Sequence, residues 1–152
     1  MNYSMEIEKL FALASGRELD ARDFYRTVEK KATDPAVQAI FKQLAVDEHN
    51  HYEMIERFRT DQTLLLKIPA PSDWKLAEQE ELPPFTPGMN ARDAIALAMK
   101  KEQAAVEFYR ALAAATADAG MRSIFENLAH MELGHKHALE SAFTGIAYPE
   151  VF

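Results

Sequence analysis

The chain repeats itself at a spacing of 84 residues, and this repeat constrains the fold more than any other feature. From the pair Met5/Met89 to the pair Thr60/Thr144 the two copies align without a gap, with 18 identities in 56 pairs. Unrelated segments of average composition would match at roughly one position in fifteen. Since a solenoid needs about three copies or more, two copies indicate a duplicated supersecondary unit.

Each copy has the apolar periodicity of two helices. Apolar or otherwise distinctive residues recur at alternating spacings of four and three, which is typical of helices that pack in a bundle. In the first copy these seam positions are Ile7, Phe11, Ala14, Glu18, Ala21, Tyr25, Val28 and Ala32, then Val37, Phe41, Leu44, Glu48, His51, Ile55 and Phe58. In the second copy they are Ala91, Ile95, Ala98, Glu102, Ala105, Tyr109 and Leu112, then Met121, Phe125, Leu128, Glu132, His135, Leu139 and Ala142.

Capping residues mark where these helices begin and end. Asp34 followed by Pro35 is typical of an N-cap with proline in the first helical turn. Asn90 is predicted to cap the third helix, and Gly145 is predicted to end the fourth. The sequence therefore predicts an all-α chain of two helical hairpins, at about 5–60 and 90–145, within a single domain of residues 1–152.

The two hairpins are joined by a linker at about residues 61–89. It holds five of the seven prolines, so a fifth long helix is not expected there, although Trp74 to Ala77 could form a short turn. A helix of about 28 residues is about 42 Å long, and some 25 extended residues reach about 80 Å. The linker is therefore long enough to cross the length of a bundle, or to let two chains exchange hairpins.

Composition narrows the classes of partner. The 152 residues are 48% hydrophobic and 27% charged, as in a soluble globular protein, with a net charge of -7. A negative chain is not expected to bind nucleic acid or anionic membrane, because both need clustered Lys and Arg. The N-terminal stretch is acidic and no segment approaches 18 uncharged apolar residues, so we expect a cytoplasmic protein.

The absence of cysteine excludes several kinds of redox and metal chemistry. With no cysteine in the sequence, disulfides, thiolate zinc sites, iron–sulfur clusters and thiol nucleophiles are all excluded. Any metal site must therefore use ligands other than thiolates.

Glutamates and histidines interrupt the apolar seams at matching places in the two copies. The six residues are Glu18, Glu48, His51, Glu102, Glu132 and His135. Each Glu-x-x-His pair places a carboxylate and an imidazole one turn apart on one helix face. Counted from the hairpin turns, all four glutamates fall within about one helical turn of the same level, far from either end of a bundle.

Four carboxylates at one level of a core require cations to offset their charge. Two divalent ions would balance the four glutamates, and neutral imidazoles would complete the ligand shells. Oxygen-rich ligation with one nitrogen for each ion suits iron or manganese, and zinc also fits chemically. Glu48 and Glu132 are the natural bridging ligands. The remaining histidines, His49, His130 and His137, lie off the seams and are not expected to be ligands.

Two tyrosines lie close to the predicted ligands. Tyr25 and Tyr109 follow Glu18 and Glu102 by seven residues, or two turns along the same face. They are either core aromatics whose hydroxyls find some polar partner, or hydrogen-bond donors to a ligating glutamate on the neighbouring helix. We favour the second interpretation.

The order Glu, Glu-x-x-His, Glu, Glu-x-x-His resembles the ferritin-like di-iron carboxylate proteins. The blocks GRELDARDFY and LAVDEHNHYEM in the first copy, and KKEQAAVEFY and LAHMELGHKH in the second, are most similar to the rubrerythrin branch. The resemblance covers nearly the whole chain apart from the linker. It implies a ferritin-like four-helix bundle with two iron ions.

The resemblance also implies roles for the six residues. Glu18 with His51, and Glu102 with His135, would be terminal ligands. Glu48 and Glu132 would bridge the ions and act in catalysis through them, supported by Tyr25 and Tyr109. Rubrerythrin-like proteins reduce hydrogen peroxide at such a centre and are often dimers with exchanged helices. We therefore expect a peroxide- or O2-reducing oxidoreductase that forms a homodimer.

The sequence departs from rubrerythrins in two ways. A rubredoxin domain needs four cysteines, and this chain has none, so electrons would come from an external donor such as a rubredoxin-like protein. Rubrerythrins also carry an extra glutamate where this chain has Ala105, whose mate in the repeat is Ala21. The bare six-ligand set equally resembles the ferroxidase centre of bacterioferritin. The alternatives are therefore a ferroxidase, or a protein that stores or senses iron without peroxidase turnover.

Overall fold

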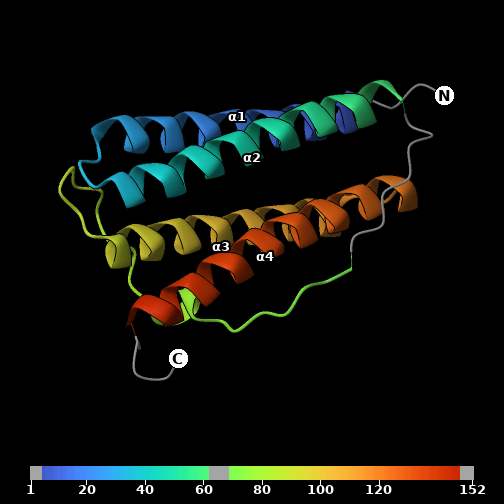
Figure 1. The fold of residues 1–152 in the computed structure, drawn as a ribbon. Coiled ribbons are helices and arrows are strands. Elements are labelled where there is room, and N and C mark those ends of the chain that lie inside the picture. The colour runs from blue at the N-terminus through green and yellow to red at the C-terminus, as the bar shows by residue number, and fades with distance from the viewer. Residues whose placement is uncertain (1–4, 62–68, 148–152) are drawn as a thin grey trace. The chain divides into compact units, whose positions relative to one another are not determined.

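The computed structural model describes residues 5–61 and 69–147, and within these ranges all regular secondary structure is helical. The elements are α1 (Met5–Lys31), α2 (Pro35–Thr60), the short 3₁₀ helix η1 (Ala77–Gln79), α3 (Ala91–Ala115) and α4 (Ala119–Ala147) (Figure 1). The predicted all-α fold with four long helices is confirmed. The chain divides into two compact units, Met1–Leu65 and Leu66–Phe152.

The first unit is an antiparallel hairpin of α1 and α2 (Figure 1). Asp34 ends the turn as predicted, because its Oδ1 accepts a hydrogen bond of 2.9 Å from the backbone N–H of Ala36, and Pro35 opens α2. Large apolar side chains line the seam: the Tyr25 and Phe41 rings lie 5.7 Å apart, and each is at most 1% exposed. The short turn and this packed seam fix the level of α1 against α2.

The second unit contains the hairpin of α3 and α4, with the same type of caps. Asn90 accepts a hydrogen bond from the N–H of Asp93, as predicted. Asp118, the repeat mate of Asp34, accepts one of 2.9 Å from the N–H of Met121. The repeat thus preserves the residue that starts the second helix of each hairpin, and with it the level at which the two helices meet.

The described part of the linker, residues 69–89, packs on the second hairpin through η1, which contacts α3. The rest of the predicted linker, residues 62–68, lies outside the described residues. The short turn starts at Ala77 instead of Trp74, and Lys75 has a φ of 56°. The reason is a side chain on α4: Glu140 accepts backbone N–H bonds from this segment and so decides where it turns.

Two predictions for the end of α4 are wrong. The helix continues through Gly145 to Ala147, and Gly145 has no positive φ, so it is not a C-cap. Ala142 is exposed, whereas Phe143 is 1% exposed. Phe143 follows Leu139 by four residues, and the larger aromatic ring takes the buried position because it removes more apolar surface from water.

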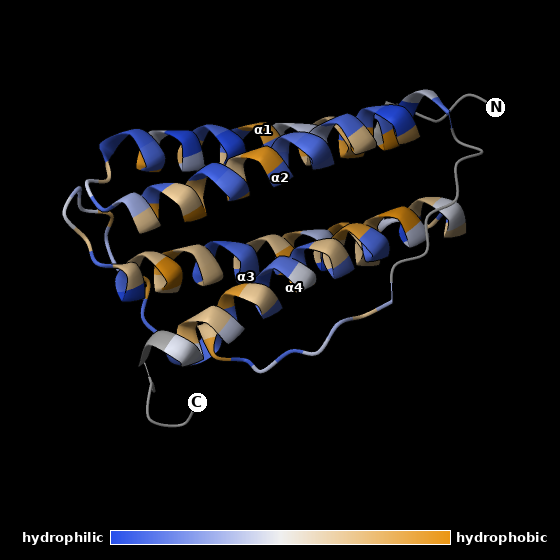
Figure 2. Ribbon diagram, in the orientation of Figure 1, coloured by the Kyte–Doolittle hydropathy of each residue, from blue (hydrophilic) through white to orange (hydrophobic). Residues whose placement is uncertain are grey.

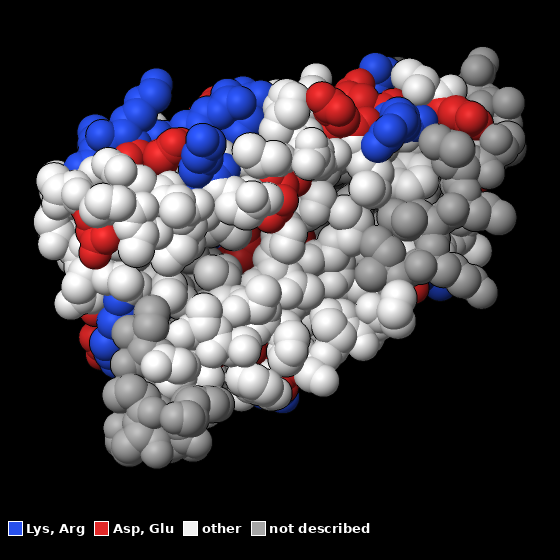
Figure 3. All heavy atoms as spheres, viewed as in Figure 1, with Lys and Arg blue, Asp and Glu red and all other residues white. Residues whose placement is uncertain are grey.

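The helices differ in how much apolar surface they carry. In Figure 2 the visible side of α1 and α2 is mostly hydrophilic, whereas α3 and α4 show many hydrophobic residues. Residues 94–99 of α3 are all buried, more than one helix face can supply. In Figure 3 charged atoms gather over α1 and α2, and the visible surface of α4 carries few.

No helix in the described ranges has the length and apolarity needed to cross a membrane.

Candidate metal centre

The first hairpin brings together three of the predicted ligands, Glu18, Glu48 and His51, which we call the first half-site. His51 Nδ1 lies 3.8 Å from Glu18 Oε2 and 4.0 Å from Glu48 Oε1. Both glutamates are 0% exposed and His51 is 5% exposed. The i, i+3 spacing on α2 aligns Glu48 and His51, and the short turn places Glu18 of α1 opposite them.

The second hairpin repeats this arrangement with Glu102, Glu132 and His135, the second half-site. His135 Nδ1 lies 3.8 Å from Glu102 Oε2 and 3.9 Å from Glu132 Oε2. Both glutamates are 0% exposed, and the His135 side chain is 22% exposed. Two copies of a sequence that is mostly different have therefore kept the same three groups at nearly the same distances.

These distances suit a shared metal ion. Two atoms that each lie about 2.1 Å from one ion are about 3.0 Å apart at a right angle and about 4.2 Å apart when opposite. The nitrogen–oxygen separations of 3.8–4.0 Å fall inside that range. Buried carboxylates need a cation, and an imidazole nitrogen adds a ligand without adding charge. The donor set of each half-site therefore fits a divalent transition-metal ion.

Arg17 adds a cation that the sequence analysis did not predict. Its Nη1 donates a hydrogen bond of 2.9 Å to Glu48 Oε2 and lies 3.3 Å from Glu18 Oε2. The side chain is 18% exposed, so it reaches inward from the surface of α1. The available signal was that both copies have a basic residue immediately before the first glutamate, Arg17 in one and Lys101 in the other.

Tyr25 and Tyr109 are buried beside neighbouring aromatic rings. Tyr25 is 1% exposed and Tyr109 0%. Phe24 lies edge-on to Tyr25 with ring centroids 5.8 Å apart, and Phe108 lies edge-on to Tyr109 at 5.2 Å. Their predicted role as hydrogen-bond donors to a ligating glutamate stays a prediction.

Two histidines outside the half-sites have other contacts. The Nη1 of Arg22 lies 3.0 Å from His49 Nδ1, and His49 Nε2 lies 3.0 Å from Glu53 Oε1, so both ring nitrogens face surface partners. The ring of His137 meets that of Trp74 at 4.9 Å and 78°. The expectation that the off-seam histidines are not ligands stays a prediction.

A second buried polar cluster surrounds Lys136 and was missed by the sequence analysis. The Lys136 cluster comprises Asp73, Glu78, Lys136 and Glu140, in which Lys136 Nζ lies 2.7 Å from Asp73 Oδ1, 2.6 Å from Glu78 Oε1 and 3.8 Å from Glu140 Oε2. Lys136 and Glu140 are 0% exposed. Glu140 also accepts N–H bonds from Trp74, Leu76 and Ala77.

The Lys136 cluster accounts for two of the buried charged residues of α4, and the second half-site contains the third. Of the five charged residues of α4, three are completely buried, Glu132, Lys136 and Glu140. Three carboxylates around an ammonium could suggest a metal site, but here Lys136 already supplies the cation. The cluster therefore ties the linker to α4. Its sequence signal was the identical repeat pair Glu56/Glu140, which the seam pattern does not explain.

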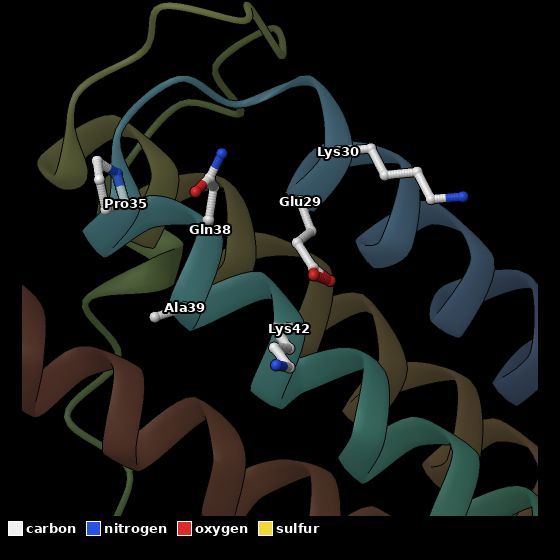
Figure 4. A pocket seen from close by; sticks show the side chains of 6 residues that line it. All are labelled: Glu29, Lys30, Pro35, Gln38, Ala39 and Lys42. Carbon is white, nitrogen blue, oxygen red and sulfur yellow. The ribbon is translucent and has the colours of Figure 1, made fainter.

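A pocket of about 450 Å³ lies near the turn of the first hairpin. It is lined by Glu29, Lys30, Pro35, Gln38, Ala39 and Lys42. In Figure 4 the Lys30 side chain points away from the others. It contains none of the predicted ligands, and its mixed charges on long flexible side chains do not form a catalytic arrangement.

Each of the two helical hairpins buries two glutamates next to a histidine. This arrangement is typical of helical proteins whose metal ligands are carboxylates and imidazoles. A family model described as rubrerythrin matches residues 9–143 of this chain. The chain therefore belongs to the rubrerythrin family.

A solved structure has the same fold. The hypothetical protein Pfu-1136390-001 from Pyrococcus furiosus is 24% identical, with a TM-score of 0.58 over 92% of this chain and 89% of that chain. This likeness supports the ferritin-like four-helix fold and carries no information on activity. No curated protein matches the chain.

Proposed function

We propose that the two half-sites together hold two iron ions and that the protein reduces hydrogen peroxide with electrons from an external donor. The observation that carries the proposal is the repeated half-site, because His–Glu separations of 3.8–4.0 Å recur in both hairpins. Membership of the rubrerythrin family supports iron over the chemically similar manganese and zinc.

The residues have distinct tasks in this function. Glu18 with His51, and Glu102 with His135, would each hold one ion. Glu48 and Glu132 would bridge the two.

Bound iron would supply the redox chemistry, since two ferrous ions provide the two electrons that convert one peroxide and two protons to two water molecules. The half-site glutamates are buried away from bulk water, and Tyr25 and Tyr109 would hydrogen-bond ligating glutamates.

Electrons must enter from outside the chain. Without cysteine there is neither a rubredoxin-type iron site nor a thiol to store reducing equivalents. The expected donor is a rubredoxin-like protein, and the expected assembly is a homodimer in which hairpins can be exchanged. O2 is the alternative oxidant.

The test is a single-turnover experiment. The iron-loaded protein, reduced once and freed of reductant, should consume about one peroxide for each pair of ferrous ions and then stop. Adding a rubredoxin-like donor and its reductase should restore steady consumption. Continued peroxide consumption by the protein alone would contradict the need for an external donor.

Ferroxidase or storage function is the second candidate. The observation that favours it is Ala105, 1% exposed, at the position of the extra rubrerythrin glutamate. Rapid re-oxidation by peroxide and slow re-oxidation by O2 would support the peroxidase. Slow, stoichiometric uptake and oxidation of added Fe(II), with no fast peroxide reaction, would support the alternative.

A further inference from the structure

We infer that Arg17 controls the entry of the second metal ion, because it holds the oxygen of Glu48 that a bridging carboxylate must give to that ion. This inference rests on the proposed metal-binding function and deepens it. Arg17 is here a positioning residue that acts through Glu48.

The two oxygens of Glu48 face different partners. Oε1 lies 4.0 Å from His51 Nδ1, on the side of the first half-site. Oε2 accepts the 2.9 Å hydrogen bond from Arg17 Nη1. An ion held by His51 can use Glu48 Oε1 without breaking the hydrogen bond between Arg17 and Glu48, and it shares with Arg17 only Glu18 Oε2, which lies 3.8 Å from His51 Nδ1 and 3.3 Å from Arg17 Nη1. A bridging role also requires Oε2, so the second ion must displace the guanidinium.

The guanidinium is strongly held but has a route outward. Nη1 lies within 3.3 Å of Glu18 Oε2 as well as bonding Glu48, and both carboxylates are completely buried. Charge-assisted hydrogen bonds to buried carboxylates are among the strong ones. The Arg17 side chain remains 18% exposed, so it can turn toward water when an ion replaces it.

The second copy has a different cation at the matching position. Lys101 precedes Glu102 as Arg17 precedes Glu18. A lysine carries a compact, strongly hydrated charge, whereas the arginine fork is pre-organised for carboxylates. The substitution of one for the other makes the two halves of the repeat unequal where the ligands are otherwise matched. We therefore expect two unequal binding steps.

The test measures binding of Co²⁺ alone by calorimetry and visible absorption, using metal-free wild-type, Arg17→Gln and Lys101→Gln proteins. Wild type should bind two ions in two steps. In Arg17→Gln the second step should become about 10- to 100-fold tighter, because a charged hydrogen bond no longer has to be broken. The first step should tighten less than the second, because the 3.3 Å contact of Arg17 with Glu18 is longer than its 2.9 Å hydrogen bond to Glu48. Lys101→Gln should tighten the second step less than Arg17→Gln does, because only Arg17 holds Glu48 Oε2.

The outcomes separate this inference from the function on which it rests. If wild type binds no Co²⁺, the proposed metal centre is wrong. If it binds two ions but Arg17→Gln leaves the second step unchanged or weaker, the role of Arg17 is wrong. Equal tightening in both variants would also overturn it, since that result indicates only the loss of one positive charge.

If Arg17→Gln does not fold, an NMR measurement on the wild-type protein tests the inference instead. Guanidinium protons held by a buried carboxylate exchange slowly with water, so the Arg17 side chain should give a sharp NMR signal without metal. Addition of Zn²⁺ up to one ion per chain should leave that signal in place, and the second equivalent should broaden or shift it. A signal unchanged at two equivalents would overturn the inference.

Discussion

Lys136 of α4 and Asp73 of the linker form a 2.7 Å ion pair whose ammonium is completely buried. One residue before it, His135 belongs to the second half-site. In the first copy of the repeat the position of Lys136 is occupied by Tyr52. The second hairpin, unlike the first, thus has a buried cation that holds the linker next to a predicted metal ligand.

Replacing Lys136 with methionine should destabilise the protein. The change keeps the apolar stem but leaves Asp73, Glu78 and Glu140 close together without their cation. Removing one partner of a buried ion pair costs about 3–5 kcal/mol, and partial exposure of Asp73 and Glu78 should reduce this to about 2–4 kcal/mol. Urea unfolding provides the measurement. The control is Lys42→Met, at an exposed position, which should change the unfolding free energy by less than about 0.5 kcal/mol. An equally small loss for Lys136→Met would contradict the stabilising role of the Lys136 cluster.

The contribution of this pair to stability should depend on pH at both extremes. Burial alone would raise the pKa of Asp73, but hydrogen bonds from Lys136 and from the N–H of Lys75 outweigh it and lower that pKa. Burial would lower the pKa of Lys136, but its bonds to Asp73 and Glu78 outweigh it and raise that pKa. Asp73 therefore stabilises the fold above its unfolded pKa, and Lys136 stabilises it below its own.

The unfolding free energies of wild type and Lys136→Met, measured across pH, should reveal this window. Their difference should be steady between about pH 5 and pH 10. It should shrink as pH falls below about 4, where Asp73 takes up a proton, and as pH rises past the raised pKa of Lys136. A difference that stays constant from pH 3 to pH 12 would count against the assignment.

Metal removal should lower the melting temperature. Without a divalent ion each half-site keeps two buried carboxylates beside a histidine, and in the first half-site Arg17 offsets only part of their charge. An ion that binds only the folded state stabilises it by about 2.7 kcal/mol at a hundredfold excess over its Kd. Calorimetric melting at pH 7.5 with and without a chelator makes the comparison. The double variant Glu48→Ala, Glu132→Ala should show no such shift; equal melting of metal-free and metal-loaded wild type would refute the prediction.

Glu48→Ala should lose metal, whereas His49→Ala should not. Glu48 faces the first half-site and is the predicted bridge, so its loss should leave at most one ion firmly bound per chain. His49, the next residue, faces Arg22 and Glu53 instead, and its removal should preserve full loading. Elemental analysis after dialysis decides between them. Two ions per chain in Glu48→Ala would disprove the bridging role.

Local sequence predicted the hairpins and the burial of their seam glutamates well. The spacing of apolar residues placed Glu18, Glu48 and Glu132 on buried seams, and all three are 0% exposed. This succeeded because a short turn and regular helices translate residue numbers directly into height and face. The capping residues Asp34 and Asn90 were predictable for the same reason, since each cap bonds an N–H within three residues.

The contacts that sequence spacing did not predict are those of long side chains and of the linker. Arg17 precedes a seam residue, and only its side-chain conformation carries Nη1 to Glu48, 31 residues away. Glu140 bonds the N–H of Leu76, 64 residues away, and this contact decides where the linker turns.

The sequence by itself thus determined the four helices and the two matched sets of seam glutamates and histidine. The tertiary structure alone decided that Arg17 donates a hydrogen bond to Glu48, a predicted metal ligand. It also decided that Lys136 ties the linker to α4 through its ion pair with Asp73. Periodicity determines which face of a helix is buried, because the backbone repeats every 3.6 residues. It does not determine which distant polar partner satisfies a buried charge, because that depends on how side chains and non-helical segments pack together.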